Sequence, residues 1–174
     1  MLTSVGIETI LQEENLLCRF SGGCQWLGWV EVSAITRWIS SIDLRDWPQQ
    51  NPKGMPLRPA MATDHRWYGF GKVIAEALDS LMLFFPGCAR YQEMLSVVMP
   101  GDKIPPHTDS QPPAWLCRVH VPLMTNARSQ FIVNRVRHSL FVGNAYRVNT
   151  EAEHSVENNG RSPRIHLMFD VRSC

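Results

Sequence analysis

The stretch RIHLMFDV, residues 164–171, alternates between two sets of side chains over its whole length. Its odd-numbered residues are all apolar: Ile165, Leu167, Phe169 and Val171. Its even-numbered residues include Arg164, His166 and Asp170. Because successive side chains of a β-strand point to opposite faces, the stretch predicts a strand with one face in a hydrophobic core.

A second stretch, RVHVPL at residues 118–123, repeats this arrangement with Arg118 and His120 on its polar face. Two strands therefore carry Arg-x-His on a single face. One interpretation is an ordinary sheet whose polar side lies in water. The other is that both polar faces line a cavity and bind a small anion, because a guanidinium group matches the two oxygens of a carboxylate.

The second half of the chain contains further short segments with strand-like alternation, separated by turn residues. The eight predicted strands cover residues 90–99, 102–109, 116–124, 129–136, 138–143, 144–150, 153–158 and 164–171. Eight short strands at close spacing are typical of a sandwich, a barrel or a jelly roll.

The first half of the chain has helix-like periodicity at residues 30–42 and 71–85. Residues 47–60, with four prolines and a glycine, predict an ordered but irregular loop. We therefore expect a single domain over residues 1–174 of a mainly β, α+β class. Its helical and irregular half at 1–88 would pack on a β core at 89–174.

Composition limits the classes of partner. The 174 residues carry a formal net charge of +1, which gives no argument for binding nucleic acid or an anionic membrane. The five cysteines form no CxxC pair and do not indicate a disulfide framework. There is no signal-peptide pattern, and the longest apolar runs are too short to cross a bilayer. We expect a soluble, cytoplasmic protein of undefined oligomeric state.

Metal-ligating residue types stand in the stretch KIPPHTDSQ, residues 103–111. His107 and Asp109 would point the same way in an extended segment and offer a nitrogen and a carboxylate oxygen to one point. The pair alone is a weak signal, but His154 is a third candidate ligand. His65, in a tryptophan-flanked loop, and His138, expected in a turn, are weaker candidates.

Two histidines and one carboxylate on one triangular face are typical of Fe(II) oxygenases, because they leave three coordination positions open. A 2-oxo acid can fill two of these positions, and dioxygen can take the third. The far carboxylate of 2-oxoglutarate then needs a buried cation, which an arginine on a strand can supply. Zinc binds similar ligands but usually takes four and performs no redox step.

The order HxD, then RVHVPLMTN, then HSVENN and RIHLMFDV resembles the aspartyl/asparaginyl β-hydroxylase family of Fe(II)/2-oxoglutarate oxygenases. The resemblance covers roughly residues 90–172. It implies a double-stranded β-helix, also called a jelly roll and similar to the cupins, with buttressing N-terminal helices. It also implies Fe(II), 2-oxoglutarate as cosubstrate and O2.

The resemblance also implies roles for individual residues. By motif, the iron ligands would be His107, Asp109 and His154. Arg164 would pair with the distal carboxylate of 2-oxoglutarate, and Arg118 and His120 would also border the cosubstrate. Ser96 is carried over by spacing alone.

The expected activity is that of a dioxygenase that hydroxylates an Asp or Asn residue, a free amino acid or another small metabolite, with release of succinate and CO2. Substrate contacts are expected in the N-terminal half. The alternatives are a non-catalytic jelly-roll protein that binds a metal or carboxylate, and a redox-silent metalloenzyme of the cupin type.

Overall fold

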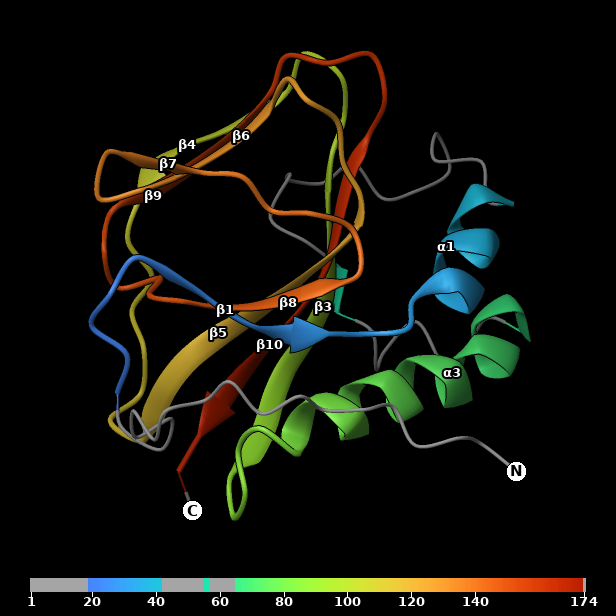
Figure 1. Ribbon diagram of the computed structural model, residues 1–174, viewed down its shortest axis with the longest axis horizontal. Coiled ribbons are helices and arrows are strands. Elements are labelled where there is room, and N and C mark those ends of the chain that lie inside the picture. The colour runs from blue at the N-terminus through green and yellow to red at the C-terminus, as the bar shows by residue number, and fades with distance from the viewer. Residues whose placement is uncertain (1–18, 42–54, 57–64, 174) are drawn as a thin grey trace.

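Two antiparallel sheets face each other in the computed structural model, which describes residues 19–41, 55–56 and 65–173 (Figure 1). The larger sheet has the strand order β1-β8-β5-β10-β3-β2, and the smaller sheet has the order β4-β9-β6-β7. Chain neighbours such as β3 and β4 lie in different sheets, so the chain crosses repeatedly between them. This arrangement is a double-stranded β-helix, and it confirms the predicted fold class.

The larger sheet consists of β1 (Cys24–Trp29), β2 (Met55–Pro56), β3 (Ala89–Val98), β5 (Trp115–Met124), β8 (Asn144–Val148) and β10 (Arg164–Arg172). The smaller sheet consists of β4 (Lys103–His107), β6 (Ser129–Val133), β7 (Val136–His138) and β9 (His154–Asn158). Two helices are described, α1 (Ser33–Ser40) and α3 (His65–Met82).

Both helices cover the outer face of the larger sheet, where the main hydrophobic core lies (Figure 1). The odd-numbered residues of β10 are fully buried there, with their counterparts Val119 and Val121 on β5. From α1, Ile35 and Ile39 pack against them, and from α3, Leu78 and Leu81 do so. Spacings of three and four residues place such side chains on one helix face, which explains the helical periodicity in the first half.

The inner face of the larger sheet carries the polar residues. Arg164, His166 and Asp170 on β10 and His120 on β5 are all buried between the sheets. A smaller hydrophobic cluster that includes Phe131 and Val156 lies beside them. The alternation therefore places the Arg-x-His faces inside the molecule and not in water.

Three local predictions in the second half of the chain need correction. Residues 129–136 form a hairpin and not one strand, because Asn134 and Arg135 have φ of 50° and 65°. Two consecutive positive φ values are what a two-residue hairpin turn requires. Residues 138–143 are no strand beyond His138, which itself ends β7 and is not in a turn.

The first half also differs from its predicted helical character. It contributes β1, an edge strand that pairs with β8. Helix α3 begins at His65 and ends at Met82, three residues before the predicted end. Of the predicted loop at 47–60, only β2 lies within the described residues.

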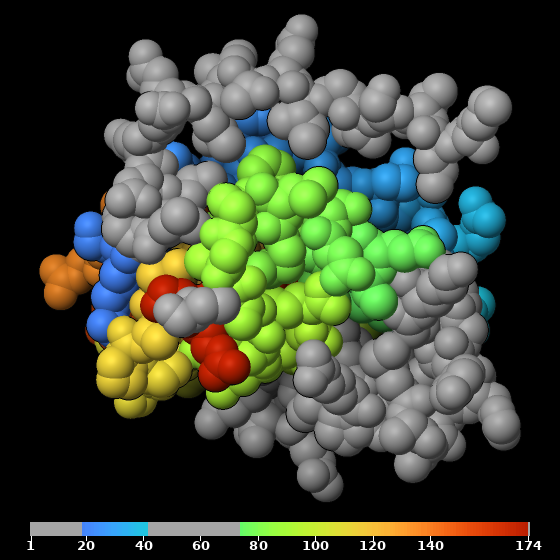
Figure 2. All heavy atoms as spheres, turned by 90° about the horizontal axis from the view of Figure 1, so that it is seen from below, coloured from blue at the N-terminus to red at the C-terminus, as the bar shows by residue number. Residues whose placement is uncertain are grey.

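Figure 2 shows the molecule from below, where α3, β3 and the end of β10 come to the surface. The green atoms of α3 and β3 form one continuous surface there, and the red C-terminal end of β10 lies beside it. None of the helices in the described part of the chain is long and apolar enough to span a membrane.

Candidate metal and cosubstrate site

His107, Asp109 and His154 converge at one end of the space between the sheets. His107 ends β4 and His154 begins β9, and the two residues are direct partners in the β4–β9 pairing. Asp109 lies two residues beyond β4, where its backbone N–H donates to the carbonyl of Thr150 over 2.8 Å. Strand pairing and this loop bond thus bring a ligand atom of each residue within 4.8 Å of the others.

The ring orientation of both histidines is fixed by backbone carbonyls. Nδ1 of His107 lies 2.8 Å from the carbonyl oxygen of Pro105, and Nδ1 of His154 lies 3.0 Å from that of Ala152. Only a protonated Nδ1 can donate to a carbonyl, so each neutral ring keeps its lone pair on Nε2. Metal-ligating histidines ordinarily make such a hydrogen bond through the ring nitrogen that does not bind the metal.

The Nε2 atoms face the carboxylate of Asp109. Nε2 of His107 lies 3.7 Å from Oδ1, and Nε2 of His154 lies 3.9 Å from Oδ2. Two ligands of one ion at bond lengths of about 2.0–2.2 Å can be at most about 4.4 Å apart, so these separations fit a divalent first-row ion. Burial lowers the pKa of His154, which also favours the neutral, metal-binding imidazole.

The carboxylate of Asp109 is held by Arg118 on β5. Nη1 of Arg118 donates to Oδ2 of Asp109 over 2.6 Å. The other edge of the guanidinium forms a two-point bond with Asp170, from Nε to Oδ1 over 2.9 Å and from Nη2 to Oδ2 over 2.7 Å. Asp170 is fully buried and also accepts from Nε1 of Trp115 over 3.1 Å.

Arg118 is therefore charged, and most of its N–H donors are taken by carboxylates of the protein. Burial alone would lower its pKa, but the bonds to Asp170 and Asp109 outweigh burial and raise it. The family resemblance placed Arg118 beside the cosubstrate. Arg118 does line the cavity that contains the three candidate ligands, but its donors point to the carboxylates of Asp109 and Asp170. Reading the sequence missed Asp170 and Trp115 as partners of this arginine, although the alternation in β10 already placed Asp170 on the polar face.

Arg164 lies deeper in the same cavity, which has a volume of about 580 Å³. Its side chain is 2% exposed, and burial lowers its pKa to about 9. Nη2 donates to Nδ1 of His166 over 2.9 Å, and within the described residues no carboxylate bonds this guanidinium. A buried cation without a counter-ion is costly, so this end of the cavity favours an anionic ligand group.

His120 lies beside this arginine. Its ring is buried, its Nδ1 lies 3.4 Å from Nδ1 of His166, and its Nε2 has no hydrogen-bond partner in the described structure. Burial, followed by the nearby charge of Arg164, lowers the pKa of both histidines well below 6.5. Both rings are therefore neutral at physiological pH, and His120 has a polar atom left for a ligand in the cavity.

Ser96 and two glutamines complete the polar lining. Ser96 is buried on β3 opposite His166 and lines the cavity. Gln92 has a φ of 50° and lies where the β3–β10 register shifts, so a bulge directs its side chain. Gln111 donates from Nε2 to Oγ1 of Thr150 over 3.0 Å. No motif or spacing in the sequence pointed to either glutamine.

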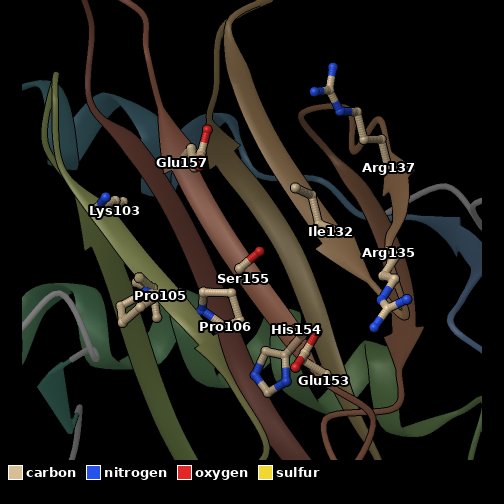
Figure 3. A pocket seen from close by; sticks show the side chains of 11 residues that line it. Lys103, Pro105, Pro106, Ile132, Arg135, Arg137, Glu153, His154, Ser155 and Glu157 are labelled. Carbon is tan, nitrogen blue, oxygen red and sulfur yellow. The ribbon is translucent and has the colours of Figure 1, made fainter.

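A groove of about 430 Å³ lies on the outer face of the smaller sheet (Figure 3). In Figure 3 the ring of His154 lies at one end of it, beside Pro106 and Glu153. Lys103, Arg135 and Glu157 also line the groove, so charges of both signs face it. His154 lines both the groove and the inner cavity, as do Ile104 and Pro105.

Solved structures share this fold. A viral collagen prolyl hydroxylase of Paramecium bursaria Chlorella virus 1, in a 2-oxoglutarate complex, matches 88% of this chain and 98% of its own at 12% identity, with a TM-score of 0.52. AviO1 of Streptomyces viridochromogenes Tue57 matches 87% of this chain and 90% of its own at 13% identity, with a TM-score of 0.61. A prolyl-4-hydroxylase of Pseudomonas putida matches 88% of this chain and 94% of its own at 13% identity, with a TM-score of 0.53.

No curated protein matches the chain in sequence. The family model described as aspartyl/asparaginyl beta-hydroxylase matches residues 71–173, which include β3 to β10 and every residue of the cavity described above. Because this match spans more than half of the chain, the protein belongs to the aspartyl/asparaginyl β-hydroxylase family and is a 2-oxoglutarate-dependent hydroxylase.

Proposed function

We propose that His107, Asp109 and His154 hold Fe(II), and that 2-oxoglutarate lies between this triad and Arg164. The observation that carries the proposal is a single cavity with a metal-ligand set at one end and a buried arginine without a carboxylate partner at the other. A dicarboxylate bound to the metal through its 2-oxo acid end would present its far carboxylate to that arginine.

The donor set fits this group. Two imidazole nitrogens and one carboxylate suit Fe(II) and leave positions open for cosubstrate and dioxygen. Bound Fe(II), with 2-oxoglutarate and O2, supplies the oxidising chemistry that inserts oxygen into a C–H bond and releases succinate and CO2.

The residues of the chain orient and shield these partners. Arg118 donates to Oδ2 of Asp109 and so orients this carboxylate. Arg164 offers N–H donors to the far carboxylate, and a two-point bond from the guanidinium would fix its orientation. Apolar side chains in the wall, Met94, Phe131, Val156 and Met168, exclude water from the space between.

The substrate in this proposal is an Asp or Asn residue, a free amino acid or another small polar metabolite. Gln92 and Gln111 line the cavity on the side of the metal ligands, where Oε1 of Gln92 lies 3.5 Å from Nη2 of Arg118. Amide side chains both donate and accept hydrogen bonds, so they suit carboxyl, amide or hydroxyl groups of such a substrate.

The test is succinate formation from 2-oxoglutarate under air, with Fe(II), in a screen of amino acids and short peptides. We expect at least one class to stimulate turnover and to gain one oxygen atom by mass spectrometry. His154→Ala serves as the inactive control. If 2-oxoglutarate binds but no member of the screen or of a cell metabolite extract is oxidised, the non-catalytic alternative is favoured.

A further inference from the structure

A second cavity lies behind Arg164. It has a volume of about 400 Å³ and is bounded by the loop after β5, the segment after β7 and the start of β10. Arg164 and Phe131 line both cavities and so form the wall between them. Arg164 and Asp170 are six residues apart on β10, roughly 20 Å at the usual rise of a strand, so the second cavity lies at the end remote from the metal ligands.

The lining of this cavity is rich in donors. Arg164 and His166 are 2% and 1% exposed, and the hydroxyls of Thr125, Ser129 and Ser139 surround the same space. Nδ1 of His166 accepts from Arg164, so the proton of this neutral ring is on Nε2. No aspartate or glutamate is among the lining residues. Such a lining suits an anion and disfavours a cation.

One guanidinium can serve two carboxylates, because its five N–H donors point along different edges. Arg118 does so in this protein: one edge bonds Asp170 while Nη1 bonds Asp109. Arg164 has the same capacity, and its hydrogen-bond partner among the described residues is His166. The cosubstrate would use the edge that faces the metal, which leaves donors toward the second cavity.

We propose that the second cavity is a binding site for a small carboxylate, which shares Arg164 with the cosubstrate and antagonises its binding. The antagonism, but not the site, rests on the proposed function. Two anions on one buried cation repel each other across a low-dielectric wall, so each lowers the affinity for the other. By linkage, the factor is the same in both directions.

Acetate is the probe, in protein loaded with Mn(II) and kept anaerobic. Saturation-transfer NMR measures acetate binding without 2-oxoglutarate. Calorimetry then measures 2-oxoglutarate affinity in acetate and in a bulky sulfonate buffer salt of equal ionic strength. We expect acetate to bind and to weaken 2-oxoglutarate several-fold, with a plateau at high acetate, because both anions can be bound at once.

Two substitutions on β6 make a matched pair. Ser129 points between the sheets and lines the second cavity, whereas Gln130 is next to it on the same strand and points to the opposite face. Ser129→Leu should abolish acetate binding and the effect of acetate on 2-oxoglutarate affinity, and it should leave 2-oxoglutarate affinity in the sulfonate salt unchanged. Gln130→Leu should behave as wild type. Ser139→Leu, at the exposed rim, replaces Ser129→Leu if that variant does not fold.

The outcomes separate the two proposals. The second site is overturned if acetate does not bind. It is also overturned if acetate weakens 2-oxoglutarate binding without a plateau and does so in Ser129→Leu as well. Loss of 2-oxoglutarate affinity in Ser129→Leu would show that the cavity is part of the cosubstrate pocket and also overturns it. Acetate binding that Ser129→Leu abolishes supports the site, even if wild-type protein binds no 2-oxoglutarate and the proposed function fails.

Discussion

Arg118 connects Asp109, a proposed iron ligand, to Asp170, a buried residue that lies outside the ligand set. The Nη1–Oδ2 distance to Asp109 is 2.6 Å, and the opposite edge of the guanidinium is held by both oxygens of Asp170. One oxygen of Asp109 is therefore occupied, and Oδ1 remains toward Nε2 of His107. The orientation of the acidic ligand thus depends on a residue that does not touch the metal position.

Asp170→Asn should weaken metal binding without removing a ligand. The asparagine can still accept from Trp115 but loses the charge that holds Arg118, so Arg118 and Asp109 gain freedom. Loss of such an outer partner typically costs about 10–100-fold in metal affinity. Calorimetric titration of Mn(II) measures it, with Asp102→Asn, at an exposed position on the β3–β4 turn, as the control. Unchanged affinity in a folded Asp170→Asn variant would disprove the positioning role.

Asp109→Ala and His154→Ala should each abolish iron binding and turnover but leave the fold intact. Both side chains face a cavity, so truncation removes little packing. In Asp109→Ala, Arg118 keeps its two-point bond to Asp170 and is not left as a buried unpaired charge. Metal binding and the circular-dichroism melting curve are measured together. Full metal-dependent turnover in Asp109→Ala would show that the triad is wrong.

The alternation in residues 164–171 was enough to predict β10 with one buried and one polar face, but it left open whether the polar face lay in water or lined a cavity. The same argument placed His107 and Asp109 together, because two residues apart in an extended segment share a side. It failed at residues 129–136, where alternation continues through the hairpin turn and only the left-handed Asn134 and Arg135 break the strand. Periodicity does not register a two-residue turn.

The bond between Arg118 and Asp170 could not be predicted for a different reason. The two residues are direct cross-strand partners in the β5–β10 pairing. Their register depends on irregularities near both ends of that pairing, and a shift of one residue would reverse the faces. Motif comparison names residue types at spacings along the chain, but it does not give the register between strands 52 residues apart.

Stability should fall as the pH drops below about 6.5. The folded protein keeps His120 and His166 neutral, because burial and Arg164 lower their pKa values well below 6.5. The unfolded chain takes up these protons near pH 6.5, so the free energy of unfolding decreases by about 1.4 kcal/mol per pH unit for each histidine until the folded pKa is reached. Above pH 6.5 this contribution is constant.

Urea denaturation of the metal-free protein at several pH values measures the slope. His120→Gln keeps a polar side chain but removes one titrating group, so its slope below pH 6.5 should be smaller than that of wild type by the share of one histidine. Exposed carboxylates contribute equally to both proteins and cancel in the difference. Identical slopes would mean that His120 is protonated in the folded state.

Substitution of Arg164 should affect 2-oxoglutarate far more than it affects the metal. Arg164 begins β10, whereas the proposed metal ligands lie at the other end of the cavity, so metal affinity should stay near that of wild type. Lysine keeps a positive charge but loses the planar two-point geometry, so Arg164→Lys should bind 2-oxoglutarate measurably more weakly. Arg164→Ala leaves a desolvated carboxylate without a partner, which should cost about 2–5 kcal/mol of cosubstrate binding.

Calorimetric titration of 2-oxoglutarate into anaerobic Mn(II) protein compares wild type with both variants. Arg135→Ala is the matched control, because Arg135 is an exposed arginine on the β6–β7 turn that lines the outer groove (Figure 3) and neither inner cavity. Its 2-oxoglutarate affinity should equal that of wild type. Equal affinity in Arg164→Ala as well would mean that the buried guanidinium does not receive the cosubstrate, and that the far carboxylate pairs with another group.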